Sequence, residues 1–274
     1  MLAAAIIVFR ETLEAALIAG IVLAATRGLA GSRAWIAAGV AGGIAGALVL
    51  AASADALSAA MAGIGQEVFN ALVLMVAVLM LVWHNVWMAR HGRELAGSVA
   101  AVGRAVVDGV RPVRVLALVV GIAVLREGGE TVLFLYGIAA SDRHGMGDTA
   151  LGCGLGLAAG TGIGALLYFG LLAIPTRALF AVTTQLITLV AAGMAAQAVN
   201  FLAAAGILDG GSQPLWDSSR LLAENSLTGR LLHVLIGYVD RPSLDQLAAW
   251  LATIVVVTGL MRLTRPQAGA VSPG

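Results

Sequence analysis

Charged residues are scarce in this sequence of 274 residues. Only 11% of them are charged and 60% are hydrophobic, so the mean hydropathy is +0.96. About a quarter of the residues in a typical soluble domain are charged, and few soluble folds could bury so much apolar surface. The composition therefore indicates a polytopic membrane protein, and it excludes an ordinary soluble enzyme or binding domain.

The sequence has no lysine and a single cysteine. All sixteen basic residues are Arg, and Cys153 is the one cysteine, which excludes an intrachain disulfide and a cysteine-rich metal site. The net charge of +1 offers no basic surface for nucleic acid. Strands of alternating hydrophobicity, which mark a membrane β-barrel, are also missing. The 35 glycines instead favour close helix packing in lipid.

Apolar segments long enough to cross a bilayer recur along the chain, each near or above the ~20 residues that ~30 Å of hydrocarbon requires. We predict an all-α protein with seven transmembrane helices in a single domain over residues 1–263, with an outer loop at 209–244 and a disordered tail at 264–274. The expected spans are 2–26, 35–57, 66–89, 113–140, 149–174, 178–208 and 245–263.

Arginines gather on alternate connections between these segments. The first, third and fifth connections and the C-terminal end carry ten of the sixteen Arg residues, whereas the other connections are more acidic. The third connection, after residue 89, holds five of them. By the positive-inside rule the N-terminus lies outside and the C-terminus inside a cytoplasmic (inner) membrane, as an odd number of spans requires.

One motif occurs twice. The sequence R-E-x-x-E in the first segment recurs 116 residues later, near the centre of the fourth, and the residues are Arg10, Glu11 and Glu14, then Arg126, Glu127 and Glu130. The two segments run in opposite directions. We therefore predict a 3+3 inverted repeat, with repeat A at about 1–90, repeat B at about 113–208, and one extra helix.

The spacing of the motif places its three charged groups on one face of a helix, within about 100° of one another. If the two faces meet, four carboxylates and two guanidinium groups sum to a charge of −2, which suits a cation. Oxygen ligands suit hard cations. Two alternatives stay open: a structural ion pair, which leaves one glutamate in each helix unpaired at a cost of several kcal/mol, and a proton relay.

A di-iron oxidase is excluded, because such helical bundles use Glu-x-x-His motifs and neither motif here has His at that offset. We therefore expect a protein that is not an enzyme. Within the spans, His84 is interpreted as a hydrogen-bonded residue near the inner interface rather than as a ligand. The glycines of the fifth span, spaced four residues apart from Gly152 to Gly164, are interpreted as a helix-packing surface.

Two R-E-x-x-E motifs on the first and fourth helices of a seven-helix chain resemble the oxidase-dependent iron permeases. That family comprises the fungal high-affinity iron permeases and the bacterial EfeU-type iron transporters, and the resemblance covers nearly the whole chain. It implies iron uptake across the cytoplasmic membrane, with iron as the transported substrate and no permanent cofactor. The metal ligands that it implies are Glu11, Glu14, Glu127 and Glu130, supported by Arg10 and Arg126.

The same resemblance implies a separate extracytoplasmic ferroxidase or iron-delivery protein as a partner, beside iron ions and membrane lipid. The glycine stripes would permit an oligomer. The second motif departs from the first in one respect, because Gly128-Gly129 stands where the first has Thr12-Leu13. The alternative function is a proton-coupled transporter of another substrate, or of another metal such as lead or manganese.

Overall fold

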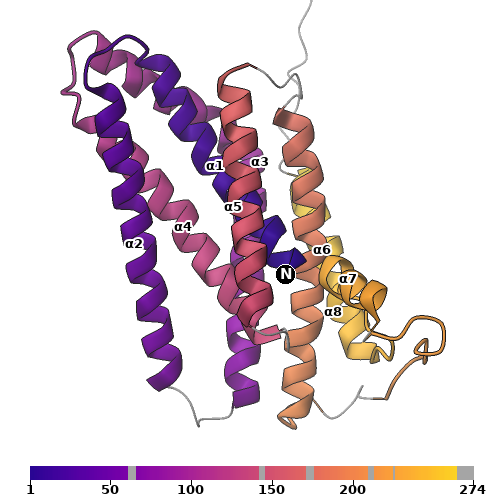
Figure 1. The fold of residues 1–274 in the computed structure, drawn as a ribbon. Coiled ribbons are helices and arrows are strands. Elements are labelled where there is room, and N and C mark those ends of the chain that lie inside the picture. Colours follow the sequence, from indigo (N-terminus) through magenta and orange to yellow (C-terminus); the bar gives the residue numbers. More distant parts are fainter. Residues whose placement is uncertain (61–65, 142–145, 171–175, 209–212, 225, 264–274) are drawn as a thin grey trace, which may run out of the picture.

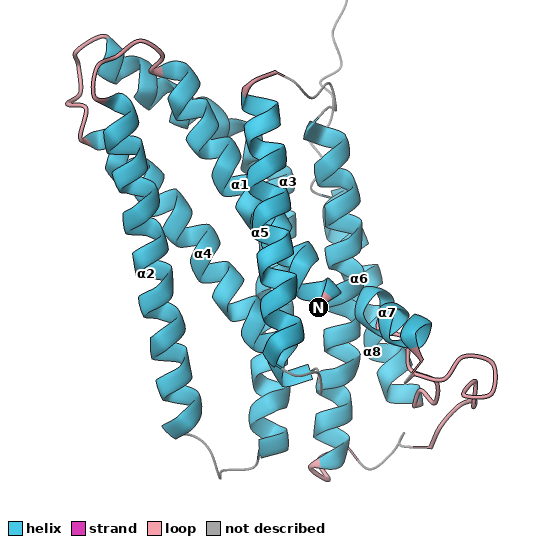
Figure 2. Ribbon diagram, viewed as in Figure 1, coloured by secondary structure: helices cyan, strands magenta, loops and turns pink. Residues whose placement is uncertain are grey.

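The computed structural model describes residues 1–60, 66–141, 146–170, 176–208, 213–224 and 226–263, and these form a bundle of α-helices (Figures 1 and 2). One isolated β-bridge joins Pro214 and Ser243. The helices are α1 (Leu2–Ala25), α2 (Ser32–Ala60), α3 (Gln66–Val107), α4 (Val115–Ser141), α5 (Met146–Tyr168), α6 (Thr176–Ala204), α7 (Leu227–Ile236) and α8 (Leu244–Leu263).

Five of the described helices, α2, α3, α5, α6 and α8, each contain an apolar stretch of 20 to 25 residues that could cross a membrane. Helices α1 and α4 have 24 and 27 residues, but each carries the three charges of its motif. Large apolar side chains such as Leu48, Leu79 and Leu151 are exposed on the outer faces of α2, α3 and α5. Exposed apolar surface of this extent is expected where lipid covers a protein.

Helix α3 corrects one expectation. It continues through 42 residues to Val107, where we expected a connection after residue 89. At 1.5 Å per residue it is about 60 Å long, twice the thickness of a hydrocarbon core. Its second half buries Val99 and Val106 against the other helices and exposes Arg90 and Arg104. Two of the five arginines that suggested a loop, Arg90 and Arg104, therefore lie on the exposed face of a helix.

Glycines determine which helices pack most closely. Helix α5 lies along α1, and a Cβ added to Gly156 would stand 2.5 Å from the carbonyl oxygen of Ala5. Helix α2 lies along α4 in the same way, with Gly39 against the carbonyl oxygen of Ala117, also at 2.5 Å. The predicted packing surface on the fifth span is therefore confirmed, since Gly152, Gly156, Gly160 and Gly164 all face α1.

Two apolar cores lie at different heights in the bundle. The first joins the N-terminal part of α1 to α3, α4 and α6, through residues that include Ile7, Leu74 and Phe134. The second joins the C-terminal part of α1 to α2, the N-terminal part of α4 and the far half of α3, through residues that include Val22 and Val120. On both α1 and α4 the R-E-x-x-E motif lies between the residues of the two cores.

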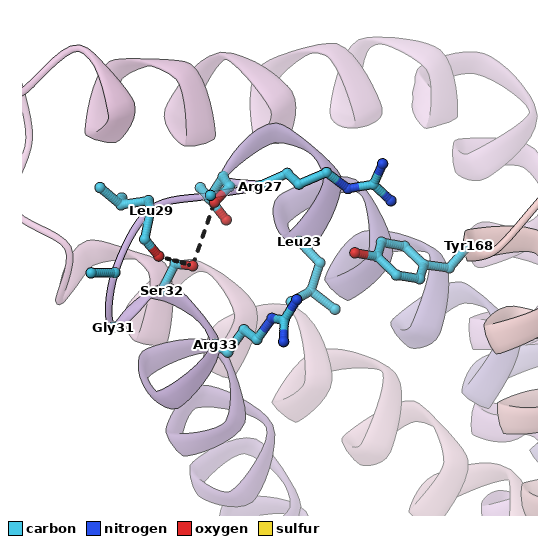
Figure 3. A pocket seen from close by; sticks show the side chains of 10 residues that line it. Leu23, Arg27, Leu29, Gly31, Ser32, Arg33 and Tyr168 are labelled. Atoms are coloured by element: carbon cyan, nitrogen blue, oxygen red, sulfur yellow. Dashed lines mark hydrogen bonds between the residues drawn. The ribbon is translucent and has the colours of Figure 1, made fainter.

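The second core lies beside the end of the bundle where the connections α1–α2 and α3–α4 meet, at the upper left of Figure 1. There the α1–α2 connection turns at Gly28 and Gly31, whose φ angles of +90° and +79° favour glycine. Figure 3 shows the pocket of about 310 Å³ beside this turn, with the side chains of Arg27 and Arg33 and the ring of Tyr168. The guanidinium of Arg27 is 5.9 Å from that ring.

The segment between α6 and α8 contains the short helix α7. Ser226 caps its N-terminus by accepting a hydrogen bond from the N–H of Gly229, and Gly237 ends it with φ +71°. Gly237 packs on Gly193 of α6, and Trp250 of α8 donates to the carbonyl of Ile236 at 2.6 Å. Helix α7 is therefore held against α6 and α8.

The exposed part of this segment carries an ion pair. The N–H and the hydroxyl of Ser219 donate to Oδ1 of Asp217, and Arg241 lies 3.0 Å from Oδ2. The hydrogen bonds from Ser219, with a smaller contribution from Arg241, hold the pKa of Asp217 below its usual value. Asp217 is therefore already engaged by groups of its own loop.

The same substitution at two glycines of α5 should have opposite effects on stability. Gly156→Ala places a methyl group against the backbone of α1, and overpacking of this kind costs about 1–3 kcal/mol. Gly154→Ala meets nothing within 4 Å and should be neutral or stabilise the helix by up to about 1 kcal/mol. The midpoint of thermal unfolding in detergent measures both, and equal midpoints would contradict the packing described for α1 and α5.

Candidate metal site

The three charged residues of the first motif form one buried ion network on α1. Arg10, Glu11 and Glu14 are each at most 2% exposed. Nη1 of Arg10 donates to Oε1 of Glu11 at 3.0 Å, and its Nε lies 2.9 Å from Oε1 of Glu14. Neighbouring turns of a helix bring the i and i+4 side chains together, so one guanidinium contacts both carboxylates. The network keeps one negative charge in excess.

The second motif makes the same pairing on α4, but its arginine is more exposed than that of the first. Nε of Arg126 donates to Oε1 of Glu130 at 3.1 Å and lies 3.8 Å from Oε1 of Glu127. The Arg126 side chain is 33% exposed, against 2% for that of Arg10. Its guanidinium carbon lies 4.4 Å from the ring centre of Trp87 on α3, which is a cation–π contact.

His84 of α3 joins the two networks. Its Nε2 lies 3.4 Å from Oε2 of Glu14 on α1, and its Nδ1 contacts Oε2 of Glu130 on α4. The imidazole is only 3% exposed. The structure thus brings all six predicted site residues into one group with His84, and we call this group of seven the charged layer. Its members are Arg10, Glu11, Glu14, His84, Arg126, Glu127 and Glu130.

Four residues of the charged layer offer ligand atoms to a common centre. One atom each from Glu11, His84, Glu127 and Glu130 lie within 4.8 Å of one another. Glu14 adjoins this cluster through its contact with His84. Ligands bound to one ion at ~2.1 Å can be at most ~4.2 Å apart, so a shift of a few tenths of an ångström would let these atoms share a small cation.

Several buried oxygen atoms in this cluster lack a hydrogen-bond partner among the residues that the structure describes. They include Oε2 of Glu11 and both carboxylate oxygens of Glu127. A buried polar atom without a partner is costly and rare in a folded protein. These oxygens are therefore free to accept a cation, and a cation would remove the cost of leaving them unpaired.

His84 is the residue of the cluster that the sequence analysis missed. We interpreted it as a hydrogen-bonded histidine near the inner interface, but it lies between the two motifs at the level of their glutamates. The signal available in the sequence was its position, since His84 is the one histidine that falls within an expected span. Its partners on α1 and α4 are distant in the chain, so no local pattern could reveal them.

Comparison with known proteins identifies the family of this chain. The chain matches the iron permease FTR1 family over residues 1–264. It belongs to this family. The chain is 32% identical to the ferrous iron permease EfeU of Shigella sonnei (strain Ss046) over 269 residues, which cover 97% of this chain and 96% of that protein.

Two further relatives carry the same name. The identity is 33% over 271 residues with the ferrous iron permease EfeU of Escherichia coli O6:H1 (strain CFT073), again with 97% and 96% of the two chains covered. It is 34% over 206 residues with that of Shigella flexneri, with 75% and 86% covered. No solved structure matches the chain. The resemblance drawn from the two motifs is therefore confirmed, and the family is one of transporters rather than enzymes.

The ion networks predict unequal effects for the two arginines. Arg10→Met removes the cation that contacts both Glu11 and Glu14, and breaking a buried ion pair from one side costs about 3–5 kcal/mol. Arg126→Met should cost less, because Arg126 is partly exposed and Glu130 keeps its contact with His84. Thermal unfolding in detergent should give the lower midpoint for Arg10→Met. The reverse order would contradict the burial described for the two motifs.

Proposed function

We propose that this protein takes up iron across the cytoplasmic membrane and that the ion passes through the charged layer. The observation that carries this proposal is the meeting of two glutamates from α1 and two from α4 in one buried group, with carboxylate oxygens that have no hydrogen-bond partner among the described residues. Membership of an iron permease family and relatives named ferrous iron permeases support iron as the substrate.

The charges of the layer suit a divalent cation. Four carboxylates and two guanidinium groups sum to −2, so one divalent ion bound beside a neutral imidazole brings the total to zero. An isolated charge at membrane depth is costly, and this balance lowers the cost of bringing iron there. Glu11, Glu14, Glu127 and Glu130 are the proposed ligands, while Arg10 and Arg126 hold the carboxylates in place. Iron is the transported substrate rather than a resident cofactor.

We propose further that α1–α6 form an inverted repeat, with α8 as the seventh span. Three features of the packing support this arrangement. The first helix of each half packs on the second helix of the other, as α1 on α5 and α4 on α2, and the third helices α3 and α6 pack on each other. Helices α1 and α4 also run in opposite directions (Figure 1). A twofold axis in the membrane plane would generate all three features.

The proposed orientation places the arginine-bearing connections α1–α2 and α3–α4 in the cytoplasm, so that α7 and its flanking loops face outwards. A separate extracytoplasmic ferroxidase or iron-delivery protein would then meet this outer face. The positive-inside rule supports the orientation, and the family resemblance supports the partner.

Labelling of single cysteines tests the orientation. In a Cys153→Ala background, Leu221→Cys lies in the proposed outer segment and Val110→Cys in the proposed inner connection, and both side chains are well exposed, at 93% and 76%. A membrane-impermeant maleimide added to intact spheroplasts should label Leu221→Cys at once. It should label Val110→Cys only after the membrane is opened, and the opposite pattern would reverse the orientation.

Iron uptake into proteoliposomes tests the function itself. Wild-type protein should accumulate radioactive iron supplied as Fe²⁺ under anoxic conditions, with Mn²⁺ and Pb²⁺ as competitors. Glu14→Gln or Glu130→Gln should abolish uptake, because each removes one charged ligand while keeping the shape of the side chain. Asp245→Asn, a carboxylate at the start of α8 outside the charged layer, serves as the control and should transport normally.

The same assay separates the alternatives. Wild-type uptake by both glutamine variants would overturn the role of the charged layer. If the wild type moves protons without iron and the variants lose this activity, the layer is a proton relay instead. If the motifs are only structural, each single variant should unfold more easily, and replacing the whole trio Arg10, Glu11 and Glu14 by apolar residues should restore stability.

A further inference from the structure

His84 differs from the other histidines that the structure describes. His91 lies two turns further along α3, with its Nδ1 3.2 Å from the carbonyl oxygen of Trp87 and its ring stacked on that of Trp87. The Nδ1 of His233 lies 2.7 Å from the carbonyl oxygen of Tyr238. Both make the backbone contact typical of a structural histidine. Neither nitrogen of His84 has a hydrogen bond of good geometry among the described residues.

A carboxylate lies beside each ring nitrogen of His84. Glu14 stands at one ring nitrogen and Glu130 at the other, and these carboxylates come from different motifs. A metal-binding histidine usually presents one nitrogen to the metal while a carboxylate or a carbonyl holds the other. His84 satisfies both parts of this description, because one of its nitrogens belongs to the cluster with Glu11, Glu127 and Glu130.

An imidazole changes which cations such a site prefers. Carboxylate oxygens alone suit Mg²⁺, Ca²⁺ and Mn²⁺, whereas imidazole nitrogen suits iron and the later transition metals. A site of four glutamates without His84 would therefore discriminate poorly against the hard divalent ions, which are far more abundant than Fe²⁺ in most media. The cluster supplies one nitrogen among its oxygens, which gives a mixed set of donors.

We propose that His84 is a direct ligand of the transported ion and that its nitrogen sets the preference of the site for Fe²⁺ over Mg²⁺ and Ca²⁺. The inference rests on the proposed function, since it assigns a further ligand to the same site. It also gives α3 a part in that site, which the two motifs alone assign to α1 and α4.

Pulsed electron paramagnetic resonance of bound Mn²⁺ tests the direct contact. The full-length protein is purified without a histidine tag, and Mn²⁺ is added below one equivalent. We expect a ¹⁴N coupling from a bound imidazole, and we expect it to become a ¹⁵N coupling in protein labelled with ¹⁵N-histidine. The coupling should persist when His91, His144 and His233 are all replaced by Gln, which leaves His84 in place.

Metal titration of two matched variants tests the selectivity. His84→Gln exchanges the nitrogen ligand for an amide oxygen, and His91→Gln makes the same change at a structural histidine on the same helix. Fe²⁺ affinity, measured by anoxic calorimetry, should fall at least about 10- to 100-fold in His84→Gln, since that loss is typical even for a residue that only supports a ligand. Mg²⁺ and Ca²⁺ affinities should change little. The His91→Gln protein should retain the wild-type order of affinities.

The outcomes distinguish this inference from the function on which it rests. A wild-type protein that binds Mn²⁺ without a nitrogen coupling overturns the role of His84 and leaves the glutamate site standing. Equal losses of Fe²⁺ and Mg²⁺ affinity in His84→Gln would make His84 a positioning residue and likewise overturn its role in selectivity. A folded wild-type protein that binds neither Mn²⁺ nor Fe²⁺ overturns both the proposed function and the ligand.

Discussion

The burial of Arg10 is the constraint on which the rest of this structure depends. A guanidinium stays charged at any physiological pH, and at 1% exposure it cannot reach water. The free energy lost when this guanidinium leaves water can be recovered only from anions in contact with it. These are the carboxylates of Glu11 and Glu14 on the same helix, at 3.0 and 2.9 Å. One excess negative charge then remains on α1. The second motif on α4 adds another at the same level, so the charged layer keeps a charge of −2 that a divalent cation would balance.

The two apolar cores show why the charges sit where they do. Along α1 the chain passes from the first core at Ile7 through the motif to the second core at Val22, and α4 passes through the same layers in the reverse order. Packed side chains thus separate the charged layer from both ends of the bundle. An ion cannot cross a packed apolar layer with its hydration shell, so the passage proposed above would require the side chains of these cores to move apart.

The sequence predicted the parts of this structure that follow from local chemistry. Charged residues at membrane depth must find one another, so the meeting of the two motifs could be expected from their spacing and their position in apolar segments. The glycine surface of α5 was also predictable, because the residues from Gly152 to Gly164 recur once per turn on one face. The helical composition followed from the lengths of the apolar segments.

Two features could not be read from local pattern. The arginines and glutamate after residue 89 have the composition of a loop, yet residues such as Val99 and Val106 pack on α1 and α4 and keep α3 helical to Val107. His84 was misplaced for a similar reason. Its contacts are with Glu14, 70 residues earlier, and Glu130, 46 residues later, and a single polar residue in a span carries no periodic signal of its own.

The departure of the second motif from the first now has a physical reason. Helices α1 and α4 each need a partner helix close to the motif, and such an approach requires a small residue on one side of the contact. On α1 the motif keeps Thr12, and the partner α5 supplies Gly160, where an added Cβ would lie 2.8 Å from that of Thr12. On α4 the motif itself supplies Gly128, and α2 keeps Ala47, at 2.6 Å. The glycine of the contact is thus on the partner helix in the first pair and on the motif helix in the second. Both pairs keep the close approach of the two helices at the motif.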